Sequence, residues 1–329
     1  MRIVVSEFMA PEGLELLRAA GPVLYAPELG ERPAALREAV RSCVALVVRN
    51  RTRVDAELLA AAPALRVIGR LGSGLDNLDC AALRAAGIPW VHAPGGNALA
   101  TAEFTLALIL ALARDLPTAL LPGCAADWSL RARWEGREVS GRCLGLVGLG
   151  RVGQALARRA RALGLTVLAS HPGRGPDDPG VRECGVELVT LPELLRRVDI
   201  LSLHASLTPA THHLIGRPEL ALLQPGALLV NTARGGLLDE AALAVALREG
   251  WLAGAALDVR DPEPPPVPDP LQGLPGLICT PHIAGLTREA QNATAVEVAA
   301  GVLRALGVRP VGRPPEAPAP DLAAAPLLL

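Results

Sequence analysis

The chain has 329 residues, a formal net charge of −1 and 50% hydrophobic residues. This length allows two domains with sizeable cores, and the balanced charge gives no reason to expect a nucleic-acid or membrane partner. Aromatic residues make up only 2%, so an aromatic stacking surface for bases is not expected. Every basic residue is an arginine, which excludes a lysine Schiff base and a P-loop lysine.

Short apolar runs alternate with longer segments rich in alanine and leucine. The predicted strands are 3–5, 45–48, 66–68, 90–92, 144–147, 166–169, 200–204, 228–231, 253–257 and 277–280, and the predicted helices include 55–62, 154–163, 240–249 and 288–305. Nearly all-apolar strands that alternate with helices are typical of parallel sheets covered on both faces. The pattern restarts after residue 140. It therefore predicts an α/β protein with two doubly wound, Rossmann-like or flavodoxin-like domains and the active site in the cleft between them.

The domain boundaries are expected at the glycine pair Gly95-Gly96 and near Gly285. Residues 1–97 with 287–312 would form a discontinuous substrate-binding domain, and residues 98–286 would form the dinucleotide-binding domain. The Ala/Pro-rich tail, 313–329, lacks periodicity and is expected to be disordered. The most apolar run, 104–113, is shorter than the roughly 20 residues that cross a bilayer, so it predicts a buried helix. Six widely spaced cysteines predict reduced thiols, a cytoplasmic location and no metal site.

A glycine-rich turn follows the predicted strand 144–147. Gly148, Gly150 and Gly153 form a Gly-x-Gly-x-x-Gly pattern with a helix after it and a further strand at 166–169. In this setting the first glycine permits a tight turn, the second lets the backbone approach a pyrophosphate, and the third lets helix pack on strand. The alternative is a glycine-rich turn without a ligand.

An acidic residue usually ends the second strand of such a unit, where it holds the ribose hydroxyls of NAD. This sequence has His171 in a loop without a carboxylate, and Arg174 follows. A 2′-phosphate would meet no negative charge there, so the residues leave NAD and NADP open. His171 is either a ribose contact or a simple loop histidine.

Three separate motifs place polar residues where predicted strands end. Arg234 follows 228–231, Glu263 lies in a proline-rich loop after 253–257, and His282 follows 277–280. The carboxyl ends of strands line the ligand crevice of a doubly wound sheet. Arginine can clamp a carboxylate and polarise its neighbouring carbonyl, while histidine paired with a carboxylate is suited to proton transfer. Together they indicate hydride transfer at the alcohol of a hydroxy acid, although each residue alone could be a surface or turn residue.

These residues and their order resemble the D-isomer-specific 2-hydroxyacid dehydrogenase family, in particular its D-3-phosphoglycerate dehydrogenase-like branch. The resemblance runs from about residue 47 to residue 291 and includes the segments 48–54, 69–79, 97–103, 231–239, 257–264 and 281–291 besides the glycine turn. It implies a nicotinamide-dependent oxidoreductase that acts on a small 2-hydroxy or 2-oxo acid, with NAD as the expected cofactor and a homodimer formed through a helix at 102–114.

The resemblance also implies roles for individual residues. Arg234, Glu263 and His282 would be catalytic. The cofactor would contact Arg151, Val152, Ala205, Thr232, Ala233 and Asp258 besides the three glycines and His171. Backbone amides of Ser73 and Gly74 would hold the substrate carboxylate, and Arg49 would face the far end of the substrate. The alternative for Arg49 is a brace within the fold.

Some positions depart from the family pattern. His171 replaces an aspartate, so NADP is possible, and Arg260 replaces the usual phenylalanine. The segments 5–9 and 49–52 are more similar to sulfolactate-type relatives, which leaves phosphoglycerate-, sulfolactate- and hydroxypyruvate- or glycerate-type substrates open. The alternative function is an NAD(H)-sensing, corepressor-like binding protein on the same fold.

Overall fold

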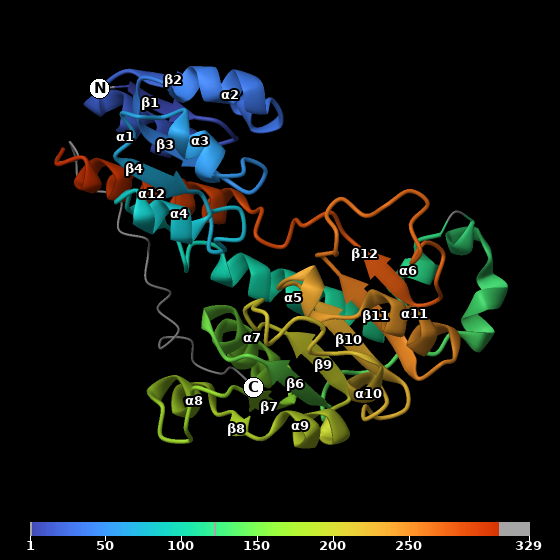
Figure 1. Ribbon diagram of the computed structural model, residues 1–329. Coiled ribbons are helices and arrows are strands. Elements are labelled where there is room, and N and C mark those ends of the chain that lie inside the picture. Colours follow the sequence, from blue (N-terminus) through green and yellow to red (C-terminus); the bar gives the residue numbers. More distant parts are fainter. Residues whose placement is uncertain (1, 122, 309–329) are drawn as a thin grey trace. The chain divides into compact units, whose positions relative to one another are not determined.

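The computed structural model describes residues 2–121 and 123–308, so the predicted tail 313–329 lies outside the described residues. The chain divides into two compact units, Met1–Asn97 with Leu286–Leu329 and Ala98–Gly285. Each unit is built around its own parallel sheet (Figure 1). The first unit is therefore discontinuous in sequence, and the chain returns to it at Leu286, where the sequence predicted residue 287.

The first unit contains five parallel strands in the order β2-β1-β3-β4-β5. They are β1 (Arg2–Val5), β2 (Val23–Tyr25), β3 (Cys43–Val48), β4 (Val67–Arg70) and β5 (Trp90–His92). The connecting elements are α1 (Pro11–Ala20), the 3-10 turn η1 (Pro27–Glu31), α2 (Pro33–Val40), α3 (Ala56–Ala60) and α4 (Cys80–Ala85). This order is the flavodoxin-like one.

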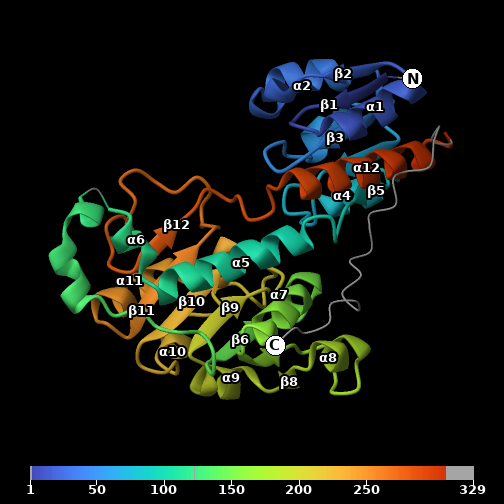
Figure 2. The same cartoon turned by 180° about the vertical axis from the view of Figure 1, so that it is seen from behind.

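Alternate residues of these strands point into two separate cores. Val4, Leu46 and Ile68 pack with residues of α2, α3 and α4. The neighbouring residues Ile3, Val47 and Val67 pack with α1 and with α12 (Arg288–Ala305), which comes from the far end of the sequence. Figure 2 shows α12 beside β5 in this layer. Both faces of the sheet are thus covered, as the all-apolar strands require.

The second unit contains seven parallel strands in the order β12-β11-β10-β9-β6-β7-β8. They are β6 (Cys143–Val147), β7 (Thr166–Ser170), β8 (Glu187–Leu188), β9 (Ile200–Leu203), β10 (Ala227–Asn231), β11 (Leu252–Leu257) and β12 (Leu277–Cys279). Six of them, from β6 to β11, have the strand order of a dinucleotide-binding Rossmann fold, and β12 extends the sheet next to β11.

Helices cover both faces of this sheet as well. One core contains residues of α5 (Ala98–Ala113), α7 (Arg151–Ala162) and α8 (Pro179–Cys184), and the other contains residues of α9 (Leu191–Arg197), α10 (Arg217–Leu220) and α11 (Glu240–Arg248). Polar side chains start several of these helices. Asp178, Thr190 and Asp239 each accept a hydrogen bond from a backbone amide of the first turn, as expected of N-cap residues.

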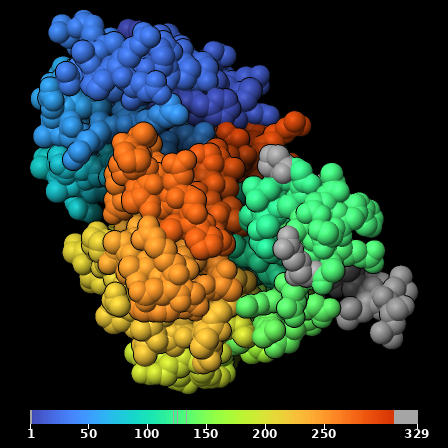
Figure 3. Space-filling model, turned by 90° about the vertical axis from the view of Figure 1, so that its right-hand side faces the viewer, coloured from blue at the N-terminus to red at the C-terminus, as the bar shows by residue number. Residues whose placement is uncertain are grey.

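A segment between α5 and β6 leaves the sheet of the second unit. It holds α6 (Leu116–Ala119) and the 3-10 turns η2 (Cys124–Ala126) and η3 (Trp128–Arg133), and it is coloured green in Figure 3. Three of its apolar side chains are strongly exposed, namely Leu120 (80%), Leu121 (58%) and Trp128 (74%). Within the described residues, no helix has both the length and the apolar character needed to cross a membrane.

The fold class predicted from the sequence is confirmed, and the predicted strands all exist with ends shifted by at most two residues. The helix expected at 104–113 lies within α5, but it is only partly buried, since Leu110 is 36% exposed while Leu108 and Ile109 are in the core. Two strands, β2 and β8, were not predicted from the sequence. β2 and β8 each form one edge of their sheet and have three and two residues. The opposite edge strands, β5 and β12, also have three residues and were predicted, so strand length alone does not explain the difference.

Candidate active site

Three adjacent strands of the second unit end in polar residues. β10, β11 and β12 pair in this order, and their carboxyl ends lead to Arg234, Glu263 and His282, respectively. The structure therefore brings together on one sheet edge three residues that the sequence predicted from three separate motifs. It does so because parallel strands all present their carboxyl ends on the same edge.

Glu263 and His282 form a direct pair, with 2.8 Å between Oε2 of Glu263 and Nδ1 of His282. A carboxylate can only accept a hydrogen bond, so the imidazole proton lies on Nδ1. Nε2 is then available to exchange a proton with a substrate. Both side chains are partly exposed, 41% for His282 and 37% for Glu263, so a small molecule can reach the pair.

The charge of Glu263 is maintained by its surroundings. Partial burial opposes ionisation, but hydrogen bonds from His282 and from the backbone amide of Arg260 outweigh it, together with the positive charge of Arg234. The pKa of Glu263 is therefore lower than that of an ordinary glutamate. The carboxylate stays ionised at neutral pH and can balance the charge of a protonated imidazole.

The turn that carries His282 is organised by Asp258, which is 1% exposed. One carboxylate oxygen accepts from the hydroxyl of Thr280 (2.6 Å) and the amide of Ile283 (2.8 Å), and the other accepts from the amide of Ala284 (2.8 Å). His282 has a positive φ of 55°, a conformation that L-residues adopt only when their surroundings impose it. Asp258, expected near the cofactor, therefore directs its carboxylate into the turn of His282.

A buried asparagine shapes the turn of Arg234. Asn231, with no exposed surface, accepts a bond from the amide of Ala233 (3.0 Å) and donates to the carbonyl of Arg234 (2.9 Å). Thr232 is 7% exposed, and its hydroxyl lies 2.8 Å from that of Thr105 on α5. Sequence reasoning did not single out Asn231, although its place at the end of a buried strand was a signal.

The glycine turn after β6 has the geometry that a dinucleotide needs. Gly148 has a φ of 101°, and a Cβ there would lie 2.8 Å from the backbone nitrogen of Ala205. A Cβ on Gly153 would lie 2.7 Å from the carbonyl oxygen of Gly148, whereas Gly150 faces open space. α7 begins at Arg151, with Val152 next, so the N-terminus of this helix directly follows Gly150. Backbone amides at a helix N-terminus suit a pyrophosphate, and the residues present fit a nicotinamide dinucleotide.

A hollow lies at the carboxyl end of β7. It is lined by His171, Arg174 and Val189 among others. Nδ1 of His171 accepts a bond from the amide of Gly173 (3.1 Å), and Arg174 forms an ion pair with Asp178. Val189, at the end of the unpredicted strand β8, was missed by sequence reasoning. Ala205 follows His204, which is partly buried. Burial lowers the pKa of His204 to about 4.

In the first unit, Arg49 follows β3 in a turn held by a buried glutamate. Glu7 is 4% exposed, and its carboxylate accepts hydrogen bonds from four backbone amides. Oε1 accepts from the amides of residues 49 (2.7 Å) and 52 (3.0 Å). Oε2 accepts from the amides of residues 50 (3.2 Å) and 51 (3.0 Å). The side chain of Arg49 reaches Oε1 of Gln291 (3.5 Å). Burial lowers the pKa of Arg49 despite the charge of Glu7, so this cation is partly removed from water. The two segments that resembled sulfolactate-type relatives thus touch each other.

Ser73 and Gly74 lie in the loop after β4, partly exposed. The carbonyl of Ser73 accepts a bond from Nδ1 of His92 (3.2 Å). Within the part of the chain that the structure describes, no backbone carbonyl accepts from the amides of Ser73 and Gly74. Their role in binding the substrate carboxylate, which the sequence led us to expect, stays a prediction.

A further polar group includes Asp261, in the loop that carries Glu263. The rings of His212 and His213 stack with 4.0 Å between centroids, and Nε2 of His212 lies 3.8 Å from Oδ2 of Asp261. All three residues are exposed. The contact between His212 and Asp261 lies at the surface, where the side chains are 51% and 48% exposed.

Comparison with known proteins agrees with this geometry. The family model described as "D-isomer specific 2-hydroxyacid dehydrogenase, NAD binding domain" matches residues 106–284, more than half of the chain. The chain belongs to the D-isomer-specific 2-hydroxyacid dehydrogenase family. It is therefore a nicotinamide-dependent oxidoreductase, and its reaction is hydride transfer between NAD(H) and a 2-hydroxy or 2-oxo acid.

The relatives in this family differ in length and name. The chain is 43% identical to the (S)-sulfolactate dehydrogenase of Chromohalobacter salexigens over 93% of its own length and 99% of that protein. It is 39% identical to the D-3-phosphoglycerate dehydrogenase of Methanocaldococcus jannaschii over 93% of its length, but it spans only 57% of that protein. The TT0316 protein of Thermus thermophilus has a similar structure, with a TM-score of 0.83, 38% identity and 94% of this chain and 98% of that chain covered.

Proposed function

We propose that this dehydrogenase acts on a 2-hydroxy acid that carries a second anionic group at its far end, of the sulfolactate or 3-phosphoglycerate type. The observation that carries the catalytic part is the 2.8 Å pair of Glu263 and His282 at the sheet edge that also presents Arg234. A histidine with a fixed tautomer, a carboxylate partner and a nearby arginine are what the interconversion of an alcohol and a carbonyl requires.

In this proposal, His282 moves the proton. Nε2 takes the proton of the substrate hydroxyl during oxidation and returns it to the carbonyl oxygen during reduction. Glu263 accepts the Nδ1–H bond and offsets the positive charge that develops on the ring. A bound nicotinamide at the glycine turn accepts or supplies the hydride.

Arg234 would bind the carboxylate end of the substrate. A guanidinium can hold the substrate carboxylate and draw electron density from the neighbouring carbonyl. In the first unit, the amides of Ser73 and Gly74 have no backbone acceptor among the described residues, and they are proposed as further substrate-binding groups. These roles distinguish 2-hydroxy acids from simple alcohols.

Arg49 would select the far end of the substrate. Its guanidinium is partly desolvated, and Glu7 holds its turn from within through four amide bonds. An anion next to a partly desolvated cation is bound more strongly than in water. The similarity to a sulfolactate dehydrogenase over nearly its whole length, and to phosphoglycerate dehydrogenases over about half of theirs, supports a sulfonate or phosphate there.

For the cofactor, the proposal favours NAD over NADP. Gly148, Gly150 and Gly153 would hold the pyrophosphate together with the first amides of α7. Arg174, the cation nearest to His171 in sequence, is already paired with Asp178, which reduces its attraction for a 2′-phosphate. His171 would contact the ribose, and Arg151, Val152, Ala205, Thr232 and Ala233 would line the rest of the site.

A homodimer is also proposed, formed through α5 and the segment after it. Leu99 (45% exposed) and Leu110 (36%) lie on α5, and Leu120 and Trp128 follow in that segment. Apolar side chains of this size are usually covered in a working assembly. Sedimentation equilibrium of the protein should give twice the mass of one chain, and Leu120→Arg should shift it toward the monomer.

The decisive experiment measures oxidation of NADH and NADPH with a panel of 2-oxo acids. The panel contains the oxo acids of sulfolactate and 3-phosphoglycerate, then hydroxypyruvate, glyoxylate and pyruvate. We expect the highest kcat/KM with a dianionic member and NADH. If no member is turned over while NADH still binds, the chain is a cofactor-binding protein and the proposal fails.

A further inference from the structure

A buried arginine lies directly in the loop that carries Glu263. Arg260 follows β11 by three residues and is only 8% exposed. A guanidinium cannot lose its proton in a protein, so its burial is costly unless carboxylates and other acceptors replace the lost water. An arginine in this place therefore needs partners, and the structure supplies them.

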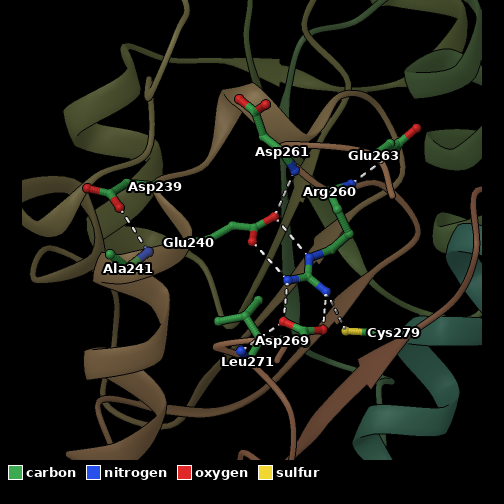
Figure 4. Close-up of polar contacts among 9 residues, drawn as sticks. All are labelled: Asp239, Glu240, Ala241, Arg260, Asp261, Glu263, Asp269, Leu271 and Cys279. Atoms are coloured by element: carbon green, nitrogen blue, oxygen red, sulfur yellow. Dashed lines mark hydrogen bonds and ion pairs between the residues drawn. The ribbon is translucent and has the colours of Figure 1, made fainter. Parts of the chain in front are cut away.

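Two carboxylates hold the guanidinium of Arg260, each through two bonds (Figure 4). Nε and Nη2 donate to the two oxygens of Glu240, both at 3.0 Å. Nη1 and Nη2 donate to the two oxygens of Asp269, both at 2.8 Å. This paired geometry is specific to arginine, because lysine has a single nitrogen.

Glu240 and Asp269 bind the two ends of the loop that carries Glu263. Glu240 is the first residue of α11, and it also accepts the amide of Asp261 at 3.0 Å. Asp269 lies beyond the proline-rich segment, and it accepts the amide of Leu271 at 2.9 Å. Arg260 thus joins the start of the loop to its end and both to a rigid helix. Asp269 keeps its charge in acid, because Arg260 lowers its pKa to about 2.

The backbone of the same residue contacts the catalytic pair. The amide of Arg260 donates to Oε1 of Glu263 at 3.0 Å, while Oε2 of Glu263 accepts from His282 at 2.8 Å. The side chain of Arg260 fixes its own main chain, and that main chain orients the carboxylate. A chain of contacts therefore leads from Glu240 and Asp269 to His282.

We infer that Arg260 is a positioning residue for the reaction: its guanidinium, held by Glu240 and Asp269, fixes the amide that orients Glu263 toward His282. This inference rests on the proposed acid–base role of Glu263 and His282. Because the guanidinium of Arg260 is buried against Glu240 and Asp269, the inferred role is positioning and not direct catalysis.

The first test replaces Arg260 with methionine and measures kcat, both KM values and the pH profile. Arg260→Met should lower kcat about 10- to 100-fold, a fraction of the loss of a full acid–base group. KM for substrate and cofactor should change less than about threefold on the same reasoning, because neither is contacted. The acidic limb of the profile should move to lower pH, because His282 loses an oriented carboxylate while Arg234 remains.

A matched control separates this effect from the general loss of an ion-paired arginine. Arg197 also pairs with two carboxylates, Glu187 and Glu193, but it is exposed and lies on α9 in the same unit. Arg197→Met makes the same change in charge and should leave kcat and the pH profile unchanged.

The sharpest test is a double variant. If Arg260 acts through Glu263, then Arg260→Met should add less than about a twofold loss of kcat in a Glu263→Gln background. Multiplied losses would overturn the inference and leave Arg260 a structural residue. If Arg260→Met does not fold, Arg260→Lys and Asp269→Asn replace it, each with a smaller loss of kcat and the same dependence on Glu263.

A measurement of the hydrogen bond between His282 and Glu263 tests the inference without relying on turnover. NMR of the imidazole protons should show a downfield Nδ1 proton for His282 in the natural protein and a weakened one in Arg260→Met. An unchanged resonance would overturn the inference. Normal turnover in His282→Ala would instead refute the proposed function, so the two failures are distinguishable.

Discussion

Replacing Glu7 with glutamine tests how the turn of Arg49 is held. Glu7→Gln keeps the shape of the side chain, but it turns one of two acceptor oxygens into a donor NH₂ group. Each oxygen now accepts two backbone amides of the 49–52 turn. In the variant, two of these four backbone amides would face the NH₂ group of glutamine, whichever orientation its side chain adopts.

The expected loss follows from these bonds. A hydrogen bond to a charged group contributes about 1.5–3 kcal/mol, so two lost bonds correspond to about 3–6 kcal/mol of local stability. The bond between the hydroxyls of Ser6 and Thr52 (2.9 Å) remains and limits the opening to the turn. Since 1.4 kcal/mol is a factor of ten, exchange of these amides with solvent should accelerate about 10²- to 10⁴-fold.

Hydrogen exchange of residues 49–52, followed by NMR or mass spectrometry, measures this directly. Asp79→Asn is the matched control, because it makes the same chemical change in the same unit at the N-cap of α4, where asparagine is as good as aspartate. The control should leave exchange of the turn unchanged. Unaltered protection of the turn in Glu7→Gln would show that the four contacts do not hold it.

Four further results are expected. His282→Ala should lower turnover about 10²- to 10⁴-fold with cofactor binding retained, and near-normal rates would remove it from the mechanism. His171→Asp should raise the NAD/NADP ratio of kcat/KM, since a carboxylate repels a 2′-phosphate; a constant ratio would place ribose recognition elsewhere. Arg49→Ala should lower kcat/KM about 10- to 100-fold for a dianionic substrate but not for glyoxylate, and equal losses would make Arg49 a brace. Arg260 lowers the pKa of Asp269 from 3.8 to about 2. The ion pair of these two residues should therefore contribute stability above about pH 4 that is lost as the pH falls through 2. Acid unfolding of Asp269→Asn, compared with that of the natural protein, measures this contribution.

Much of the fold was predictable because it depends on local patterns. All-apolar strands, an Ala/Leu-rich helix between each pair and one glycine turn are enough to predict parallel sheets. The edge strands β2 and β8 were not predicted, although the three-residue edge strands β5 and β12 were, so a short edge strand is only sometimes visible in the apolar pattern. Their existence depends on the neighbouring strand.

The grouping of the candidate site residues was predictable for a similar reason, while their catalytic roles stay a prediction. Arg234, Glu263 and His282 each follow a strand, and parallel strands bring such positions together. Some contacts around them come from residues distant in sequence: Glu240 binds Arg260, and Thr105 contacts Thr232. Nothing in the local sequence marks these partners, because only the register of the folded sheets makes them neighbours.

The discontinuous first unit has a consequence for the order of folding. Its five strands are all synthesised early, but α12, which covers the face formed by Ile3, Val47 and Val67, follows only after the whole second unit. Until then that face exposes apolar side chains, which makes a nascent chain prone to association. Contacts of such long sequence separation also form slowly. We therefore expect the unit that is synthesised first to be the last to close.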